Sequence, residues 1–397
     1  MKNIFLLSEL FYPNKTSTAY IMTEIAKYLG KNHYVSVICS DIVYDSNYSE
    51  ESNSELKGIN IIRTKSPKID KNKMLSRLKG SFITALRFGK VVKSKVKSSD
   101  TVFAVTNPFL LVLTLAILRQ FNRFDYVLLV HDVFPENAIP AGLTNPNSLI
   151  YKLSKMVYDW AYSKADRLVV LGRDMKEVVE SKISSKKPIY VIENWYDEDT
   201  RILPDLNKEE YLGENFGDKI VIGFAGNNGR VQNLSKFIEL FSRVKNERLQ
   251  LLVVGDGAMQ QTCEEIVGDK KLNNVSFLGP KPRSEQSNFL NCFDIGLVTL
   301  ASGMLGLGVP SKTYNLLALG KPILYIGDSK SELDMLIKEN NIGWSFNWEE
   351  EATIIEFLKG LSITSNKIGE NALEVAKSNY TIDIINAKIE KVILNEH

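Results

Sequence analysis

The feature that most constrains this chain is a strand–helix–strand rhythm that runs through it twice. The fully apolar run Ile4–Leu7 suits a strand buried in a parallel sheet. Residues 18–29 then place Ile21, Ile25 and Leu29 at i, i+4 and i+8, which predicts one apolar face of a helix. The rhythm continues with predicted strands at Val35–Cys39, Val102–Val105, Val127–Val130, Leu168–Leu171 and Ile189–Ile192.

The same rhythm begins again at a predicted strand, Ile220–Phe224, followed by a glycine-rich turn at 225–230 and a helix at 234–244. Further strands are predicted at Leu249–Val254, Val275–Leu278, Ile295–Val298 and Pro322–Ile326. Strands that alternate with helices form parallel sheets covered on both faces. We therefore expect an α/β fold of two Rossmann-like, doubly wound domains, each with a possible nucleotide-type site at its strand ends.

The boundary between the two domains is expected in the charged stretch Asp197–Lys219, which contains Pro204. This assigns residues 1–197 to the first domain and residues 198–379 to the second. The final stretch, Ile382–Leu394, has its apolar residues on one helical face. We expect it to cross back and pack on the first domain, with which residues 380–397 are therefore grouped.

Composition excludes several other classes of protein. A net charge of +2 gives no overall attraction to nucleic acid. Three scattered cysteines (Cys39, Cys263, Cys292) lack the spacing of a disulfide framework or a zinc site, which favours a reducing, cytoplasmic setting. No signal peptide is recognisable, and the longest apolar stretch, 108–118, is about half the length of a spanning helix.

The most informative segment, residues 303–322, reads GMLGLGVPSKTYNLLALGKP. Its three early glycines permit an unusual loop, and Pro310 suits the first turn of a helix that Gly320 ends. The free amides at a helix start bind phosphate, and Lys312 adds a positive charge. The alternative is a capped structural helix after a loop.

A second glycine-rich motif, GFAGNNGR at 223–230, follows a strand and precedes a helix. Gly226 and Gly229 allow close approach of the backbone to a ligand, and Arg230 offers a guanidinium for phosphate oxygens. Glycine turns after strands are common, so the hypothesis of a phosphate site depends on the two motifs together.

His131 and Asp132 follow the predicted strand 126–130. A lone histidine is more often structural than catalytic, but a place at the carboxyl end of a parallel strand favours a functional role. We interpret the nearby Glu136 as an exposed loop acid.

Residues 65–97 hold eleven lysines and arginines against one acid, Asp70, with a roughly helical apolar stripe. A basic amphipathic helix suits an anionic membrane surface, with Lys79, Arg87 and Lys90 as candidate contacts. The alternative is the solvated face of an ordinary domain helix. Nucleic acid is disfavoured, because aromatic residues do not alternate with the charges and no known binding motif accompanies them.

Taken in order, several motifs make the chain resemble the family 4 glycosyltransferases of GT-B fold, above all bacterial members that build O-antigen, capsule or exopolysaccharide. They are IFLLSELFYPNKTSTAYIMTEIAKYL, HDVFPENA, VIENWYDED, GFAGNNGRVQNL, LLVVGDG, VSFLGPKPRSE and VPSKTYNLLALGKP. The resemblance covers nearly the whole chain. It implies two domains with a cleft between them and transfer of a hexosyl or N-acetylhexosaminyl group from a nucleotide-sugar, in the first instance a UDP-sugar, with retention of anomeric configuration.

The resemblance also implies roles for individual residues. Arg230 matches the arginine that grips the donor diphosphate, whereas Gln232 replaces the lysine that follows, for which Lys236 could compensate. Leu307 and Asn315 stand where the family has two glutamates, the second of which, at the position of Asn315, binds the ribose. The donor site is expected to comprise Gly229, Arg230, Gln232, Gly308, Val309, Ser311, Lys312 and Asn315.

In the ribose-binding pattern, the second of those glutamates corresponds to Asn315, which can still bond hydroxyls through its amide. Thr16 and Ser17 replace the family's Gly-Gly loop on the acceptor side. His131 and Asp132 are implied to lie near the transferred sugar, with no general base assigned. The triplet Asp197-Glu198-Asp199 is interpreted as a solvated acidic loop, so neither a metal nor another cofactor is expected.

The expected protein is thus a cytoplasmic glycosyltransferase at the inner face of the cell membrane. Its partners would be a nucleotide-sugar, a lipid-diphosphate-linked or oligosaccharide acceptor, and an anionic membrane. Because Leu307, Asn315 and Gln232 depart from the family pattern, a catalytically silent subunit that binds a nucleotide or a partner transferase is the alternative. A nucleotide-sugar epimerase on the same fold would need an acidic catalytic cluster, which the sequence lacks.

Overall fold

A computed structural model describes residues 1–14, 16–41, 56–67, 74–183, 186–213, 216–362 and 366–396. By their internal contacts the residues divide into two compact units. The first consists of residues 1–138, 144–192 and 386–397, and the second of residues 139–143 and 193–385. The main division lies after Ile192, a few residues before the boundary expected at Asp197.

The first unit contains a seven-stranded parallel sheet in the order β3-β2-β1-β4-β5-β6-β7. This confirms the doubly wound α/β arrangement, in which the chain runs outward from β1 in one direction and then returns to continue in the other. The strands are β1 (Asn3–Leu7), β2 (Tyr34–Ser40), β3 (Ile59–Thr64), β4 (Thr101–Val105), β5 (Asp125–Val130), β6 (Arg167–Val170) and β7 (Ile189–Val191).

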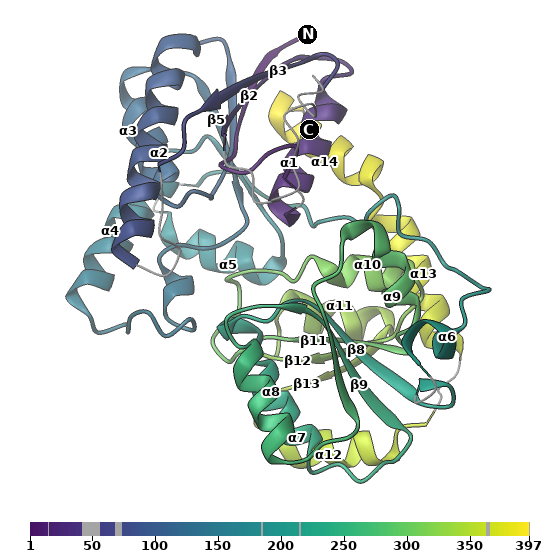
Figure 1. Cartoon of the computed structure of the whole chain (residues 1–397). Helices are drawn as coiled ribbons and strands as arrows, with labels where there is room; N and C mark the ends of the chain where they lie inside the picture. The colour runs from purple at the N-terminus through teal and green to yellow at the C-terminus, as the bar shows by residue number, and fades with distance from the viewer. Residues whose placement is uncertain are drawn as a thin grey trace. The chain divides into compact units, whose positions relative to one another are not determined.

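The central strands of this sheet are apolar because helices cover both of their faces. Every residue of β4 and β6 is buried, as are four of the five residues of β1. Helices α2, α3 and α4 lie on one face and α1 and α14 on the other (Figure 1). The helices are α1 (Ser17–Leu29), α2 (Met74–Lys95), α3 (Leu110–Phe121), α4 (Leu149–Tyr162), α5 (Arg173–Lys182) and α14 (Ile382–Leu394), with a short 3-10 turn, η2 (Glu136–Ala138).

The second unit contains a six-stranded parallel sheet in the order β10-β9-β8-β11-β12-β13. Two strands run further than predicted, because β8 and β9 stay paired as far as Asn227 and Asp256. The predicted turn at 225–230 is therefore wrong in its first three residues. The strands are β8 (Ile220–Asn227), β9 (Leu249–Asp256), β10 (Val275–Gly279), β11 (Ile295–Thr299), β12 (Ile323–Ile326) and β13 (Gly343–Phe346).

Helices also cover this second sheet on both faces. Helix α7 packs against α8 and α12, whereas α13 packs against α10 and α11 (Figure 1). The core beneath α7 includes Phe237 and Phe241, both fully buried. The helices are α6 (Lys208–Leu212), α7 (Leu234–Phe241), α8 (Gln260–Asp269), α9 (Gln286–Asn291), α10 (Lys312–Ala318), α11 (Glu332–Asn340), α12 (Glu351–Gly360) and α13 (Asn366–Asn379), with 3-10 turns η4 (Arg230–Gln232) and η5 (Arg283–Glu285).

The last helix, α14, has the bounds that the sequence predicts, and its residues from Asn386 onward belong to the first unit. There His33 Nε2 lies 2.9 Å from a carboxylate oxygen of Glu390, and Lys2 Nζ donates to the Leu394 carbonyl at 3.1 Å. His33 therefore helps to hold the end of the chain. None of the helices that the structure describes is both long and apolar enough to cross a bilayer.

Candidate functional site

The two glycine-rich motifs of the second unit meet where β8 ends. Gly226 has a φ of +148°, which a residue with a side chain rarely adopts. A Cβ built on Gly226 would lie 3.5 Å from Cδ and 3.7 Å from Nζ of Lys312. Lys312 is the first residue of α10, so two motifs that are far apart in sequence place a cation against an open stretch of backbone.

Burial and two charged groups set the electrostatics around Lys312. Burial lowers the pKa of Lys312, the nearby Asp197 carboxylate opposes this shift, and the Arg283 guanidinium adds to it. Asp197 forms an ion pair with Arg283 and accepts a hydrogen bond from Gln286 at 2.7 Å. Among the described residues, no carboxylate lies within ion-pair distance of Lys312 itself.

Asp197 is also a correction to the sequence interpretation. It was expected in a solvated acidic loop, but it is only 8% exposed, whereas Glu198 and Asp199 are exposed. The sequence did not indicate its pairing with Arg283, which lies 86 residues further on. The local signal for a buried role was its place as the last residue of the motif VIENWYD, which begins in the predicted strand Ile189–Ile192.

Asn315 lies one turn into α10 and is buried, with its side-chain amide committed to the segment after β7. Its Oδ1 accepts hydrogen bonds from the Asp197 amide at 2.7 Å and from the Thr200 hydroxyl at 3.3 Å. Its Nδ2 donates to the Asp197 carboxylate at 3.2 Å. In this arrangement Asn315 fixes Asp197; its predicted contact with a ribose stays a prediction.

The turn after β8 places Arg230 at the surface, where η4 begins. Gln232 stabilises this turn, since its Oε1 accepts a hydrogen bond from the Gly229 amide at 3.1 Å and its carbonyl accepts one from Thr299. Within the described part of the chain, Arg230 forms no ion pair. Gln232 and Gly229 thus shape the turn that presents the Arg230 guanidinium.

The suggestion that Lys236 replaces the missing family lysine is not supported by its position. Its ammonium lies 3.4 Å from a carboxylate oxygen of Glu351 and 5.1 Å from the ring centre of Trp348. Both contacts hold the Lys236 ammonium beside the start of α12 and not at the turn that carries Arg230.

The loop before α10 is held by an acid that sequence reasoning missed. The Asp328 carboxylate, just after β12, accepts hydrogen bonds from the amides of Gly303 and Leu305, both at 2.9 Å. Leu307 is buried and belongs to the packing of this loop. The remaining predicted donor residues of the loop, Gly308, Val309 and Ser311, are half-buried.

In the first unit, His131 and Asp132 come directly after β5, as predicted. The backbone amides of His131 and Asp132 both donate to the Thr106 hydroxyl oxygen, at 3.2 and 3.3 Å. Burial lowers the pKa of His131 to about 4, so the imidazole is neutral at pH 7. Its Nε2 is buried and has no hydrogen-bond partner among the described residues.

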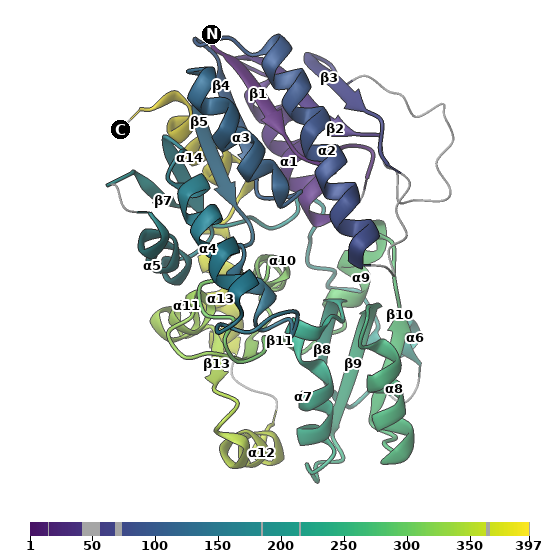
Figure 2. The ribbon, with the colours of Figure 1, turned by 90° about the vertical axis from the view of Figure 1, so that its left-hand side faces the viewer.

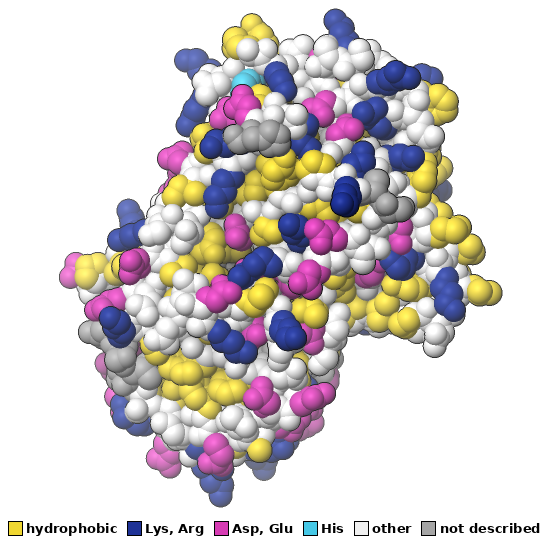
Figure 3. Space-filling view, turned by 180° about the vertical axis from the view of Figure 1, so that it is seen from behind, with side chains coloured by type: hydrophobic (Ala, Val, Ile, Leu, Met, Phe, Trp, Pro, Cys, Tyr) yellow, Lys and Arg dark blue, Asp and Glu magenta, His cyan; other side chains and the backbone are white. Residues whose placement is uncertain are grey.

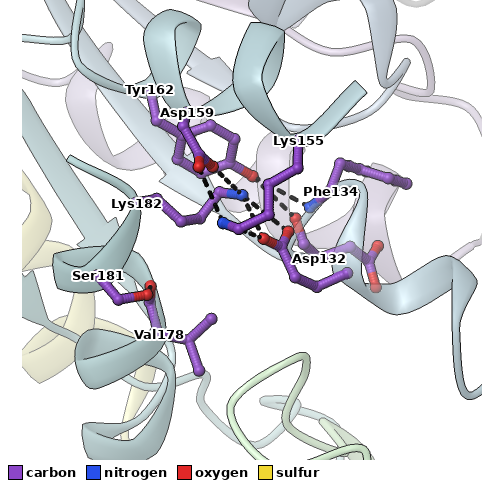
Figure 4. A network of polar contacts seen from close by, with 9 residues as sticks. Asp132, Phe134, Lys155, Asp159, Tyr162, Val178, Ser181 and Lys182 are labelled. Atoms are coloured by element: carbon purple, nitrogen blue, oxygen red, sulfur yellow. Dashed lines mark hydrogen bonds and ion pairs between the residues drawn. The ribbon is translucent and has the colours of Figure 1, made fainter. Parts of the chain in front are cut away.

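The loop that carries His131 and Asp132 is fastened by a charge network (Figure 4). Lys182 Nζ, at the end of α5, lies 2.7 Å from both Glu136 carboxylate oxygens and from Asp159 Oδ1. Lys155 Nζ forms ion pairs with the same two acids, at 3.0 Å from Glu136 Oε1 and 2.8 Å from Asp159 Oδ2. The interpretation of Glu136 as an exposed loop acid is wrong, since its carboxylate is largely enclosed by two lysines.

An aromatic ring completes this network. Lys182 Nζ lies 5.2 Å from the ring centre of the buried Tyr162. The Tyr162 hydroxyl accepts a hydrogen bond from the Phe134 amide and donates to the Asp132 carbonyl, each at 3.4 Å. Helices α4 and α5 therefore hold both ends of the segment between Asp132 and Glu136.

The residues predicted on the acceptor side have mixed positions. Thr16 caps α1 by accepting a hydrogen bond from the Ala19 amide at 3.3 Å, and Ser17 begins the helix. On α2, Lys79 and Lys90 are exposed, whereas Arg87 donates to the Lys65 carbonyl. Lys68, Lys71 and Lys73 of the basic stretch lie outside the described residues. Across the described ranges, no three His, Cys, Asp or Glu side chains come together as metal ligands.

Solved structures of sugar-transferring proteins share this fold. Sucrose-phosphate synthase from Thermosynechococcus elongatus is similar with a TM-score of 0.78 at 14% identity, over 100% of this chain and 99% of that chain. Anabaena HepE, solved in complex with UDP, has a TM-score of 0.71 at 14% identity over the whole of both chains. The two doubly wound parallel sheets and these structural similarities together assign the chain to the GT-B fold class.

Sequence comparisons identify the family within that class. The sequence model of the family Glycosyltransferase Family 4 matches residues 19–200, and that of the family Glycosyl transferases group 1 matches residues 208–375. The probable glycosyltransferase WbjE of Pseudomonas aeruginosa is 33% identical over 87% of this chain and 86% of its own length. The putative colanic acid biosynthesis glycosyl transferase WcaI of Escherichia coli K12 is 29% identical over 30% of this chain and 29% of its own length. The chain belongs to the family 4 glycosyltransferases, which confirms the resemblance.

Proposed function

We propose that this glycosyltransferase is retaining and metal-independent, and that it moves a hexosyl or N-acetylhexosaminyl group from a UDP-sugar. The observation that carries the proposal is Lys312, a half-buried cation that lies against the glycine backbone at the end of β8 and has no ion-pair partner among the residues the structure describes. A desolvated cation beside open backbone is suited to bind a diphosphate.

The chemistry follows from where negative charge develops. As the bond between the sugar C1 and the leaving diphosphate breaks, charge accumulates on the phosphate oxygens. Lys312 and the exposed Arg230 would stabilise that charge without a metal ion. Gly229, Gln232 and the loop residues Gly308, Val309 and Ser311 would line the same donor site.

The acceptor oxygen forms the new bond to C1 on the face that the diphosphate leaves. The acceptor proton passes to an oxygen of the leaving phosphate, so no protein general base is assigned. His131 would contact the transferred sugar as a neutral hydrogen-bonding group through its unpartnered Nε2. Asp132, beside it, is the second residue proposed at this end of the reaction.

The choice of donor and acceptor has support from named relatives. HepE structures contain UDP and UDP-glucose, and WcaI is described as acting in colanic acid biosynthesis. We infer that residues 198–379 bind the UDP-sugar and that the first domain binds a lipid-diphosphate-linked or oligosaccharide acceptor of a surface polysaccharide. With such an acceptor, the reaction would take place at the inner face of the cell membrane.

The test is a calorimetric and thermal-shift screen against UDP, GDP and common nucleotide-sugars in the presence of EDTA. Wild type should bind a UDP-sugar saturably, and Arg230→Ala should weaken that binding about tenfold or more, because a charge-assisted contact is lost. Arg243→Ala is a matched control, since Arg243 is an exposed arginine of the same unit paired with Glu351.

The sugar that binds is then used in a transfer assay, and the anomeric configuration of the product is determined by NMR. An inverted product would contradict the retaining mechanism, and activity that requires an added divalent cation would contradict metal independence. Absence of binding to every nucleotide would overturn the donor site itself and favour a silent subunit.

A further inference from the structure

Helix α4 is apolar on the side that faces away from the protein. Its inner side buries aromatic residues, among them Tyr151, Tyr158 and Tyr162. Its outer side exposes Leu149, Ile150, Leu153, Met156 and Val157, which are between 41% and 77% accessible. A surface helix of a soluble domain normally carries polar residues there. Hydrophobic side chains also project at the right-hand edge of the view in Figure 3, where this helix lies.

The neighbouring helices extend the exposed apolar surface. Helix α3 packs against both α2 and α4, and the three lie side by side on one face of the sheet (Figure 2). On α2, Leu78, Phe82 and Leu86 are exposed at i, i+4 and i+8; on α3, Ile117 and Phe121 are exposed at i and i+4. An apolar surface that spans three helices is typical of an interaction site.

The charges on the same three helices have one sign. Together α2, α3 and α4 contain nine lysines and arginines but a single acid, Asp159. That acid is neutralised by Lys155 and Lys182. Exposed lysines such as Lys79, Lys90 and Lys152 therefore surround the apolar rows, and the partner must be both apolar and anionic.

We propose that this face, formed by the outer sides of α2, α3 and α4, docks on a lipid bilayer that carries anionic headgroups. The apolar row of α4 enters the boundary between headgroups and acyl chains, and the lysines bind the headgroups. A second copy of the chain fits less well, because a symmetric contact would bring two basic faces together.

This inference deepens the proposed function by naming the surface through which the enzyme reaches a lipid-linked acceptor. The sequence indicates a membrane contact on the basic stretch 65–97; the proposed face includes α2 of that stretch and adds α3 and α4. Among the residues whose exposure is described, α4 carries five exposed apolar side chains against three on α2, and its sequence contains only two lysines.

The first experiment measures sedimentation of the full chain with vesicles of phosphatidylcholine, with or without phosphatidylglycerol. Wild type should bind the anionic vesicles, and the double variant L153D/M156D should bind them at least about tenfold more weakly. Lys90→Gln should reduce binding about fivefold, as one basic contact is lost. The control Ile202→Asp changes an exposed apolar residue of the second unit and should have no effect.

A spectroscopic measurement shows which residues enter the bilayer. The native cysteines are all buried, so Met156→Cys can be labelled selectively with an environment-sensitive NBD dye. Its emission should shift to the blue on anionic vesicles, whereas Ile202→Cys should not respond. Equal responses of the two labels, or vesicle binding that L153D/M156D leaves unchanged, would overturn the proposal.

Two further readouts separate this inference from the proposed function. L153D/M156D should retain nucleotide binding by calorimetry, so a loss of vesicle binding alone concerns the surface and not the donor site. Light scattering tests the second copy as occupant: a concentration-dependent dimer that the same variant abolishes would assign this face to self-association and overturn the bilayer proposal.

Discussion

The side chain of Lys312 lies against the α-carbon of Gly226, with its Nζ 3.7 Å from where a Cβ on that glycine would be. The contact joins the first residue of α10 to the end of β8. Any larger residue at 226 would be strained at a φ of +148° and would crowd the lysine. The glycine therefore leaves room for both the cation and a ligand beside it.

Replacement of Lys312 by methionine should separate ligand binding from stability. Burial lowers the pKa of Lys312, which means that the protein surroundings disfavour its charge. We expect Lys312→Met to leave the melting temperature of the free protein unchanged or higher while it weakens UDP binding about tenfold or more. Lys359→Met, at an exposed ion pair with Glu356, is the control for both measurements. Unchanged UDP affinity in Lys312→Met would contradict its role at the diphosphate.

Asn315→Asp should destabilise the second unit, although it restores a carboxylate at a position where the family has one. The Asn315 amide donates to Asp197, and a second buried carboxylate would remove that hydrogen bond and repel Asp197. The expected loss is about 2 kcal/mol in the free energy of unfolding, measured by urea titration. Combining it with Asp197→Asn should recover a large part of this loss. Additive effects in the double variant would show that the two side chains are not coupled.

The sequence predicts the middle of each sheet and one edge strand of each, β7 and β10, but misses the opposite edges. Strands such as β4 are buried on both faces, so their apolar runs are unmistakable. The edge strands β3 and β13 were missed, because they are only partly buried and their residues, INIIRT and GWSF, mix polar with apolar types. Edge strands have one free side, and their sequences are accordingly less constrained.

The candidate site divides in the same way. Local motifs located Lys312, Arg230 and His131 correctly at the ends of strands or starts of helices, since each signal lies within a few residues. The partnerships of Asn315 with Asp197 and of Glu136 with Lys182 were not predictable. The residues of each pair are distant in sequence. Their contact depends on how the helices pack, and the sequence of a single segment does not predict that packing.

Lys182→Met should destabilise the first unit strongly. Its ammonium is fully buried and is the closest partner of the acids Glu136 and Asp159 (Figure 4), so its loss leaves two carboxylates short of a cation. The expected cost is about 3 kcal/mol, because removal of one partner of a buried ion pair exposes the desolvation penalty of the other. Lys176→Met on the same helix breaks only an exposed pair with Glu180 and should cost less than about 0.5 kcal/mol. Equal costs for the two variants, measured by chemical denaturation, would contradict a structural role for the network.

The neutral state of His131 should make stability depend on pH in a defined window. Burial lowers its pKa from 6.5 to about 4, so below pH 6.5 the unfolded chain takes up a proton that the folded chain does not. Stability should therefore fall as the pH drops from 6.5 toward 4, and this residue should account for about 2 kcal/mol of the loss between pH 7 and pH 5. His131→Gln removes the titrating group and should flatten that part of the profile, while carboxylates elsewhere contribute equally to both proteins. Parallel pH profiles for wild type and His131→Gln in urea titrations would mean that the folded imidazole is readily protonated, and would remove the basis for treating it as a neutral hydrogen-bonding group toward the sugar.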